Sequence, residues 1–336
     1  MSNLLDGRPQ RILSILVPTY NRAGCLAECL DALSRDPTVA GGMDVEVLIS
    51  DNCSTDGTQE VCEAYARRFP DTFVYVRQPQ NIGPSANFTY LIKHGTGKFL
   101  KFQQDRYAVE PGVIGRIVET VRQCEKEHPV LFFGNEYMFH LPVGTYPIQS
   151  FDELLDTVSY WTTWIGGYGF WRDEAEFVIP IQDRYAESML QQVAVILSLF
   201  ERNRIGYLFN MKQYHDCKVP RGPIRGYNAA KVFSQNYLGI LKSFLGPGKI
   251  TKAAFEREKK RLYFGHLYSM YFEIDYGTEL EKGDFFKYTK DFHGNWYYWG
   301  SLLALPAIKL AKRLPSPAWN GFVNLLRLGR RLVAKS

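Results

Sequence analysis

Short apolar runs alternate with amphipathic stretches over the first 135 residues. Each run is five to seven residues long, which is typical of the buried strands of a parallel sheet. The predicted strands are 11–17, 44–50, 73–78, 98–102 and 129–135. Helical patterns lie between them, at 23–33, from the end of 51–58 to Arg68, at 84–94 and at 111–127. This alternation predicts an α/β fold with a mostly parallel open sheet and flanking helices.

The alternation stops near residue 140. Residues 140–182 are rich in Gly, Trp, Tyr and Pro, and helix-like stretches follow at 183–200, 228–245, 251–275 and 281–291. The length of 336 residues fits roughly two domains. We therefore expect an α/β domain over 1–215, a helical extension over 216–291 and a separate tail over 292–336.

Polar segments follow four of the predicted strands. We call them the first loop (18–22), the second loop (51–58), the third loop (80–87) and the fourth loop (103–106). In open α/β sheets, ligands bind outside the carboxyl ends of the strands. The pattern therefore predicts that the four loops converge on one ligand site at one edge of the sheet.

The four loops also carry motifs in a fixed order. They read VPTYNR (17–22), SDNCSTDGT (50–58), NIGPSAN (81–87) and FQQD (102–105). Together these resemble the family-2 glycosyltransferases of the GT-A fold. The second motif is most similar to the bacterial surface-polysaccharide branch, which includes abequosyltransferase-like O-antigen enzymes. The resemblance covers about 11–135 and implies a nucleotide-binding half there, an acceptor half over 136–215 and a GT-A catalytic domain over 1–215.

The resemblance implies that the loops bind a nucleoside-diphosphate sugar. Asp51, at a strand end, has the chemistry to accept hydrogen bonds from uracil or cytosine, and the resemblance assigns its position to the base. The alternative for Asp51 is a loop-capping carboxylate, Asp56 is expected to be a helix N-cap, and Gly83 fits a turn. The predicted nucleotide-sugar-binding residues are Pro18, Thr19, Tyr20, Asn21, Asp51, Asn52, Asn81, Gly83, Asn87, Gln103, Gln104 and Asp105.

The fourth loop departs from the D-x-D motif of the family, which holds a divalent cation on the two phosphates. Here Asp105 keeps the last carboxylate, while Gln103 offers only an amide oxygen. Because Mg²⁺ can be held by one carboxylate plus phosphates, we expect Mn²⁺ or Mg²⁺ to bind weakly at Asp105. Arg106 is a candidate to neutralise diphosphate charge, and Lys101 is expected to face solvent.

Inverting sugar transfer needs a base for the acceptor hydroxyl, which in the family follows a Gly-Gly loop near the start of a helix. The segment WIGGYGFWR (164–172) resembles that loop. Asp183 is the predicted base and Glu187 the second choice, followed by Asp173 and Glu174. The alternative for Asp183 is an acid that complements a helix dipole.

The resemblance also suggests acceptor contacts. Trp161, Trp164, Gly166 and Gly167 are the predicted acceptor-binding residues, and a core role is the alternative for both tryptophans. His215 with Arg221 or Arg225 is a further candidate for contact with diphosphate or acceptor. A polar surface loop is the alternative for this segment.

The basic excess lies at the end of the chain. Residues 1–291 hold 33 basic and 35 acidic residues, a net charge of −2, whereas 292–336 hold seven Lys/Arg and no acid. Apolar and basic positions alternate at helical spacing there, so we predict a helix that lies on a membrane surface. The alternatives are a helix pair packed on the domain with a solvated basic face, and a dimer contact. No apolar run reaches 18 residues and no secretory signal is visible, so we expect a cytoplasmic location at the inner face of the membrane.

The sequence therefore predicts a glycosyltransferase that moves a sugar from a UDP- or CDP-sugar to a hydroxyl of a lipid-linked glycan, without a nucleic-acid partner. The alternative is a degenerate nucleotide-sugar-binding or scaffold protein at the membrane. A nucleotidyltransferase would need a Gly-rich loop after the first strand, which VPTYNR does not provide.

Overall fold

A computed structural model describes residues 11–139, 141–219, 228–268 and 282–303. The chain divides into two compact units, Met1–Arg221 and Gly222–Ser336.

The first unit is built on an eight-stranded mixed sheet with the order β3-β2-β1-β4-β8-β6-β9-β7. Strands β8 and β7 run antiparallel to their neighbours, and the other pairings are parallel. A separate antiparallel pair joins β5 (Tyr107–Val109) to β10 (Tyr214–Asp216). The bounds of the eight strands are β1 Leu13–Thr19, β2 Val45–Asp51, β3 Phe73–Arg77, β4 Phe99–Phe102, β6 Val130–Asn135, β7 Gly144–Ile148, β8 Tyr168–Trp171 and β9 Gly206–Met211.

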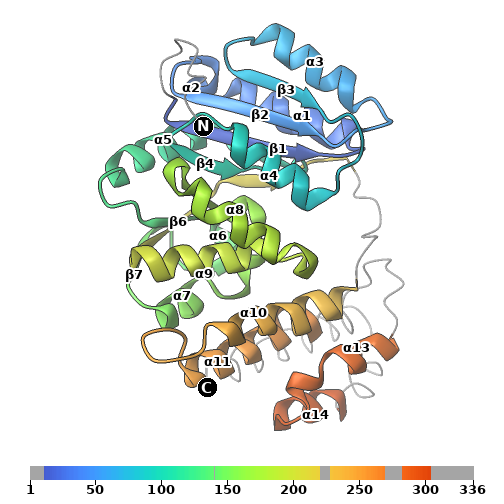
Figure 1. The fold of residues 1–336 in the computed structure, drawn as a ribbon, viewed down its shortest axis with the longest axis vertical. Helices are drawn as coiled ribbons and strands as arrows, with labels where there is room; N and C mark the ends of the chain where they lie inside the picture. The colour runs from blue at the N-terminus through green and yellow to red at the C-terminus, as the bar shows by residue number, and fades with distance from the viewer. Residues whose placement is uncertain (1–10, 140, 220–227, 269–281, 304–336) are drawn as a thin grey trace, which may run out of the picture. The chain divides into compact units, whose positions relative to one another are not determined.

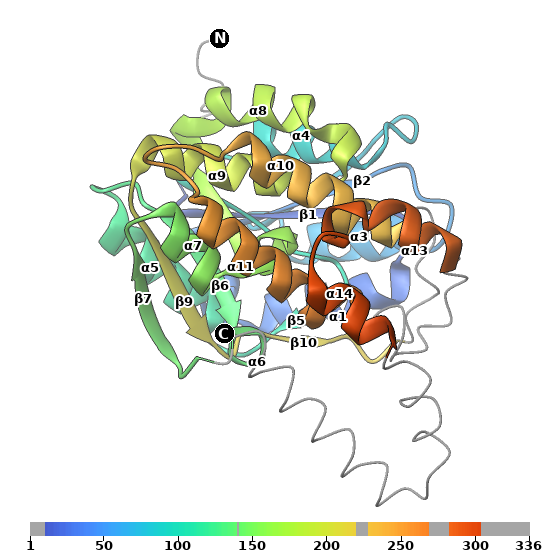
Figure 2. The same cartoon turned by 90° about the horizontal axis from the view of Figure 1, so that it is seen from below.

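Helices cover both faces of this sheet (Figures 1 and 2). One face carries α1 (Ala23–Arg35), α2 (Pro37–Ala40), α3 (Thr58–Arg68) and α5 (Val113–Cys124). The other carries α4 (Pro84–His94), α8 (Ala175–Arg184) and α9 (Gln191–Asn203). The short helices α6 (Glu136–Phe139) and α7 (Phe151–Thr157) lie near β6 and β7, respectively.

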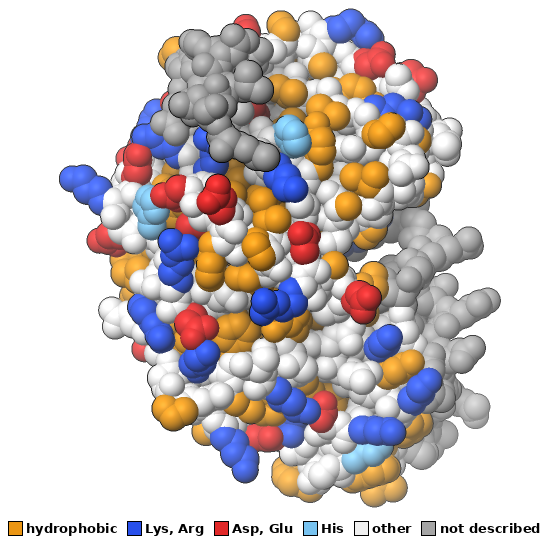
Figure 3. All heavy atoms as spheres, in the orientation of Figure 1, with side chains coloured by type: hydrophobic (Ala, Val, Ile, Leu, Met, Phe, Trp, Pro, Cys, Tyr) orange, Lys and Arg blue, Asp and Glu red, His pale blue; other side chains and the backbone are white. Residues whose placement is uncertain are grey.

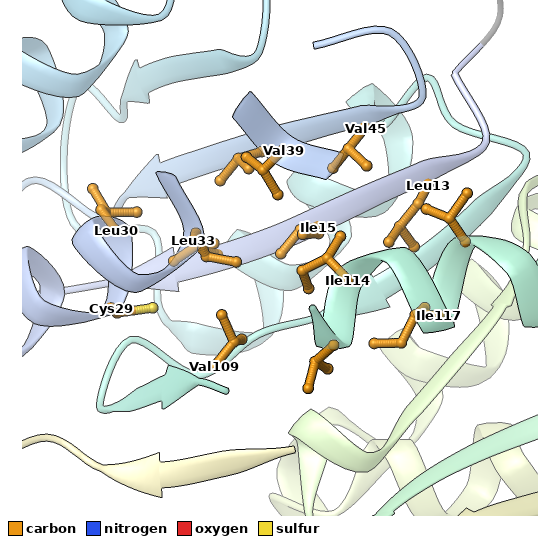
Figure 4. Packing of buried hydrophobic residues seen from close by; sticks show 14 of the residues in the cluster. Leu13, Ile15, Cys29, Leu30, Leu33, Val39, Val45, Val109, Ile114 and Ile117 are labelled. Carbon is orange, nitrogen blue, oxygen red and sulfur yellow. The ribbon is translucent and has the colours of Figure 1, made fainter. Parts of the chain in front are cut away.

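Alternate residues of β1 build the core beneath α1 and α5. Leu13 and Ile15 point from β1 toward Leu33 of α1 and Ile114 of α5, as Figure 4 shows. All four side chains are buried. Full burial of such a side chain contributes about 1.5–3 kcal/mol each, so this packing fixes β1, and with it the loop that follows, in the middle of the sheet.

The predicted strands and helices of the first 135 residues occur within three residues of their predicted bounds. The sheet has more strands than predicted, because β7, β8 and β9, which follow residue 140 in the chain, also belong to it. The predicted helix over 183–200 is wrong: α8 ends at Arg184, Met189 takes a left-handed φ of 59°, and α9 begins at Gln191. A helix cannot continue through that backbone conformation.

The second unit is helical. It contains α10 (Tyr237–Ser243) after a π-helix over Lys231–Asn236, α11 (Lys252–Leu262) followed by a π-helix over Tyr263–Leu267, α13 (Lys282–Tyr288) and α14 (Trp296–Leu303). Tyr263 packs against Tyr298 of α14, with ring centroids 5.4 Å apart. None of the helices in the described ranges is both long and apolar enough for a bilayer crossing.

Helix α14 has one buried and one exposed side. Tyr297 and Tyr298 are buried, whereas Trp296, Trp299 and Leu303 are 75 %, 47 % and 81 % exposed. The predicted tail covers 292–336, and its part over 304–336 lies outside the described residues. Figure 3 shows one face of the molecule, where acidic and basic side chains are interspersed.

Candidate active site

The first and second loops are joined by hydrogen bonds at the carboxyl ends of β1 and β2. The Asn21 side chain accepts from the Thr55 N–H at 2.8 Å, and the Asn21 N–H donates to Ser54 Oγ at 2.8 Å. Asp56 accepts from the N–H groups of Ala23 and Thr58, at 3.1 and 3.0 Å. Asp56 therefore binds the first N–H groups of two helices, α1 and α3, but it stands one residue before Gly57, which is the N-cap residue of α3.

Asp51 is fully buried at the end of β2. Its Oδ1 accepts from the N–H and the hydroxyl of Ser54, at 2.9 and 2.5 Å. Its Oδ2 accepts from the Tyr75 hydroxyl at 3.2 Å and lies 3.8 Å from Arg77 Nε. These are the contacts of the loop-capping alternative. Asp51 exposes no surface to a base in this conformation, although Arg77 beside it is 35 % exposed.

The third loop is held by asparagines. Asn52 Nδ2 donates to Asn81 Oδ1 at 3.0 Å, and Asn81 Oδ1 also accepts from the Gly83 N–H at 2.9 Å. Gly83 has a φ of 83° and precedes α4, so its position suits glycine. Asn87 is buried and exchanges two hydrogen bonds with Ser50, at 2.5 and 3.1 Å. In this structure Asn87 anchors α4 to β2.

The fourth loop meets the first. Asp105 Oδ2 accepts from Thr19 Oγ1 at 2.9 Å and lies 3.6 Å from Arg22 Nε. Burial raises the pKa of the Asp105 carboxyl, and Arg22 and the Thr19 hydrogen bond oppose that rise. Pro18 is half-buried and Tyr20 is 44 % exposed beside them. The structure thus brings the four loops to one edge of the sheet.

The fourth loop offers one carboxylate to a cation. Gln103 is buried, and its amide nitrogen donates to the carbonyls of Gln104 and Tyr107, at 3.1 and 2.9 Å. That side chain stabilises the turn. In the part of the chain that the structure describes, no three His, Cys, Asp or Glu side chains are grouped to hold a metal ion. The residues present fit only a weakly held cation that takes its other ligands from phosphates.

The Gly-Gly loop lies against the fourth loop. Trp164 Nε1 donates to Gln104 Oε1 at 2.8 Å. A Cβ on Gly167 would lie 2.8 Å from Trp164 Cε3, and one on Gly166 would lie 3.1 Å from Cζ2, so the indole requires small residues here. The Trp164 ring packs edge-on against Tyr107 and Tyr214. These contacts are those of the core alternative for Trp164.

Trp161 lies on another part of this segment. It is half-buried and packs against Phe139, with ring centroids 6.4 Å apart. No contact in the structure tests its predicted role toward an acceptor.

Lys101 does not face solvent, so that prediction is wrong. Its side chain is buried under the Gly-Gly loop, and its Nζ donates to Gly166 O at 2.8 Å. The Gly-Gly loop and Tyr214 of β10 cover this face of β4, and this leaves no solvent-facing position for residue 101. Burial lowers the pKa of Lys101 to about 7.

Asp183 lies in the last turn of α8, not near the start of a helix. Its Oδ1 accepts from Thr89 of α4 at 3.1 Å, and its side chain is exposed. Glu187 is exposed too, on the short 3₁₀ turn Ala186–Ser188, so it does not share a helix face with Asp183 as predicted. Helix α9 begins beside the Gly-Gly loop with two buried amides: Gln192 Nε2 donates to Thr163 O at 2.6 Å, and Gln191 precedes it.

Asp173 and Glu174 lie at the opposite edge of the sheet. The Arg172 N–H next to them donates to Lys98 O, before the start of β4, at 2.8 Å. Glu174 is buried and accepts from Asn203 at 2.8 Å. Neither residue lies beside the four loops, because β8 runs antiparallel to β4 and carries the chain away from them.

His215 lies on β10 and is exposed, 3.1 Å from Glu110 Oε1. This contact fits the surface alternative for that segment. Arg221 and Arg225 lie outside the described residues.

Several residues of this edge are not evident from the motifs. Arg22 is the last residue of the first motif, but only the structure pairs it with Asp105. Tyr75 and Arg77 lie in a strand that reads as structural, and the period-2 alternation of side chains in β3 is the one signal that places both on the side of Asp51.

Comparison with known proteins supports the fold. Residues 14–135 match the model of a family described as glycosyl transferase family 2. Abequosyltransferase RfbV of Salmonella typhimurium is 33 % identical over 88 residues, which is 26 % of each chain. The minor teichoic acid biosynthesis protein GgaB of Bacillus subtilis is 24 % identical over 114 residues, 34 % of this chain and 12 % of GgaB. The chain thus matches about a quarter or less of the length of these relatives.

Two solved structures share the architecture over most of both chains. TarS 1–349 of S. aureus has a TM-score of 0.58 at 16 % identity and covers 83 % of this chain and 78 % of its own. The mannosyltransferase PcManGT of Pyrobaculum calidifontis has a TM-score of 0.50 at 14 % identity and covers 91 % and 88 %. The predicted α/β architecture is confirmed, and residues 14–135 match the glycosyl transferase family 2 model.

Proposed function

We propose that the protein is a glycosyltransferase that moves a sugar from a nucleoside-diphosphate sugar to a hydroxyl group of a glycan. The observation that carries this proposal is the convergence of the four loops: Thr19 of the first loop is bonded to Asp105 of the fourth, and Asn52 of the second to Asn81 of the third. A ligand with a base, a ribose and two phosphates is long enough to contact several such loops at once.

The nucleotide is proposed to be UDP or CDP, with its base beside the second loop. TarS, which shares the fold, was solved in complex with UDP-GlcNAc. Asp51 holds Ser54 and Tyr75, so a direct contact with the base requires the Tyr75 hydroxyl to leave Asp51 Oδ2. The predicted base contact of Asp51 remains a proposal.

The diphosphate is proposed to lie at the first and fourth loops, where cationic groups are available. Arg22 is 47 % exposed and sits 3.6 Å from Asp105. Arg106 is half-buried in the fourth loop. A weakly bound Mn²⁺ or Mg²⁺ at Asp105 would neutralise phosphate charge in the same place. Arg22 competes with such a cation for the same carboxylate oxygen, which supports weak binding.

In the proposed transfer, the acceptor oxygen forms a bond to the anomeric carbon while the bond from that carbon to the β-phosphate oxygen breaks. The nucleoside diphosphate leaves with that electron pair, and a carboxylate takes the acceptor proton. Glu187 and Asp183 are the proposed bases, since both are exposed acids that follow the Gly-Gly loop. The configuration at the anomeric carbon is proposed to invert.

The acceptor is proposed to be a lipid-linked glycan of a bacterial surface polysaccharide. The relatives RfbV and GgaB, named as an abequosyltransferase and a teichoic acid biosynthesis protein, support this class. Peripheral attachment to the inner face of the cell membrane would bring the site to that acceptor. The exposed side of α14 and the seven Lys/Arg of 292–336 support the attachment.

A nucleotide-sugar-binding protein without catalysis is the second candidate. The start of α9 beside the Gly-Gly loop carries Gln191 and Gln192 instead of carboxylates, which favours this candidate.

The test uses the full chain with UDP-, CDP- and GDP-sugars, with and without Mn²⁺. We expect one nucleoside diphosphate to bind and its sugar to be hydrolysed slowly or transferred. Binding with no hydrolysis or transfer to any glycan acceptor would favour the second candidate. Failure to bind any of the three nucleotides would refute both.

A further inference from the structure

The side chain of Lys101 is buried in the first unit without a carboxylate partner among the described residues. It is 2 % exposed and lies on β4 between the apolar residues Leu100 and Phe102. A buried ammonium group costs free energy that a methionine of similar length would not. Because burial of this group is unfavourable, we looked to its hydrogen bonds for its role.

The ammonium group has three donors, and the structure supplies three acceptors. Lys101 Nζ donates to Gly166 O at 2.8 Å, to the Tyr214 hydroxyl at 2.5 Å and to Phe102 O at 3.3 Å. It also lies 5.1 Å from the ring centroid of Tyr214. These acceptors come from the Gly-Gly loop, from β10 and from the residue that precedes the fourth loop.

Tyr214 is itself held in place. Asn135, at the end of β6, is fully buried and donates from Nδ2 to Tyr214 O at 2.8 Å. The Tyr214 ring packs edge-on against Trp164, with centroids 5.4 Å apart. Lys101 therefore joins the Gly-Gly loop to a rigid group that the main sheet anchors.

Two hydrogen bonds connect the Gly-Gly loop to the segment formed by β4 and the fourth loop. Lys101 reaches Gly166, Trp164 of the same loop donates to Gln104 at 2.8 Å, and Gln104 is three residues from Lys101 along the chain. The Gly-Gly loop is thus held at two points near its start, Gly166 by Lys101 of β4 and Trp164 by Gln104 of the fourth loop.

We propose that Lys101 is a positioning residue that fixes the position of the Gly-Gly loop relative to the fourth loop. This inference rests on the proposed function, in which the fourth loop contacts the diphosphate and the Gly-Gly loop contacts the acceptor. Lys101 touches neither ligand. Its loss would move the acceptor side relative to the nucleotide side, while the nucleotide loops keep their own hydrogen bonds.

The variant that tests this is Lys101→Met, which keeps the length of the side chain and removes its donors. Lys98→Met is the matched control, because Lys98 precedes the same strand and pairs with Glu125 on the surface, 2.5 Å away. Tyr214→Phe removes one of the three acceptors, and the double variant Lys101→Met/Tyr214→Phe tests whether the two residues act together.

Hydrogen exchange measured by mass spectrometry shows how firmly the two loops are held, and it does not require an activity assay. In Lys101→Met we expect faster exchange in peptides that span 160–168 and 103–107, and unchanged exchange in the second loop. Lys98→Met should leave all of these peptides as in the natural chain. Unchanged exchange at 160–168 in Lys101→Met would overturn the proposal, whatever the enzyme does.

Kinetics and binding separate positioning from folding. We expect Lys101→Met to bind UDP, or whichever nucleotide the natural chain binds, within about threefold of the natural affinity, and to lower kcat about tenfold to a hundredfold. A one-ångström misplacement has effects of that size. Tyr214→Phe should have a smaller effect, and the double variant should be no worse than Lys101→Met.

A merely structural role would lower both the melting temperature of Lys101→Met and its nucleotide affinity. A loss of nucleotide affinity well beyond threefold, together with a lower melting temperature, would therefore contradict the proposal. If the natural chain transfers no sugar, the proposed function fails. The exchange experiment still decides whether Lys101 fixes the position of the Gly-Gly loop.

Discussion

Thr19 donates a hydrogen bond to Asp105 across 86 positions of sequence, and this contact joins the ends of two neighbouring parallel strands. Both side chains are buried, so the acceptor oxygen depends on a protein donor. Arg22 Nε lies 3.6 Å from the same oxygen, Asp105 Oδ2. The first and fourth loops therefore share one carboxylate at this edge of the sheet.

Thr19→Val removes the donor and keeps the shape. Because a buried acceptor loses its partner, we expect the free energy of unfolding to fall by about 1–3 kcal/mol. Denaturant unfolding measures this change. Thr19→Ser keeps the hydroxyl and should lose less than half as much; equal losses in the two variants would show that the hydrogen bond to Asp105 contributes nothing.

Asp51→Ala removes the acceptor of the Ser54 N–H and hydroxyl and the carboxylate beside Arg77. We expect a loss of about 2–3 kcal/mol in the free energy of unfolding, together with a loss of nucleotide binding. Asp51→Asn keeps an acceptor for Ser54, so the fold should survive. Calorimetric titration with UDP and CDP then tests the base contact, and unchanged affinity in Asp51→Asn would assign Asp51 to the loop alone.

Arg22→Gln removes a cation from the proposed diphosphate site. We expect UDP to bind about tenfold more weakly, while uridine, which has no phosphates, binds as before. Arg35→Gln is the control, because Arg35 lies at the other end of α1 and is 77 % exposed. Equal effects on UDP and uridine would contradict the assignment of Arg22 to the phosphates.

The lowered pKa of Lys101 makes stability depend on pH. Burial brings this pKa to about 7 in the folded chain, against about 10.4 in an unfolded chain. Between these values the unfolded chain binds the extra proton, so the free energy of unfolding should rise with pH from 7 to 9, by up to about 1.4 kcal/mol per unit. Chemical unfolding at each pH measures it, and the curve of Lys101→Met should lack this rise.

The exposed side of α14 is proposed to contact a membrane. Trp296→Ala/Trp299→Ala should reduce co-sedimentation with anionic vesicles, and deletion of 296–336 should abolish it. Met43→Ala is the control, since Met43 is an equally exposed apolar side chain of the first unit. Sedimentation of the truncated chain at the level of the full chain would refute the membrane role of the tail.

The sequence predicted the first half of the fold closely, because short apolar runs and capping residues such as Asp56 are local signals. It also predicted which loops meet, since parallel strands present their carboxyl ends at one edge. The later strands were missed: β8 is only four residues long and its pattern is continuously apolar. The burial of Lys101 was missed too, because alternation with apolar residues is the same for a solvated lysine and for one that other segments cover.

Strand β8 also constrains how the molecule is made. It inserts between β4 and β6, although both precede it in the chain by more than thirty residues. Until the ribosome has released residue 171, β4 and β6 therefore present bare backbone edges, which are templates for intermolecular pairing. A fragment cut at residue 135 would retain those bare edges permanently, so the region that matches the family 2 model should be insoluble when it is expressed without the residues that follow it.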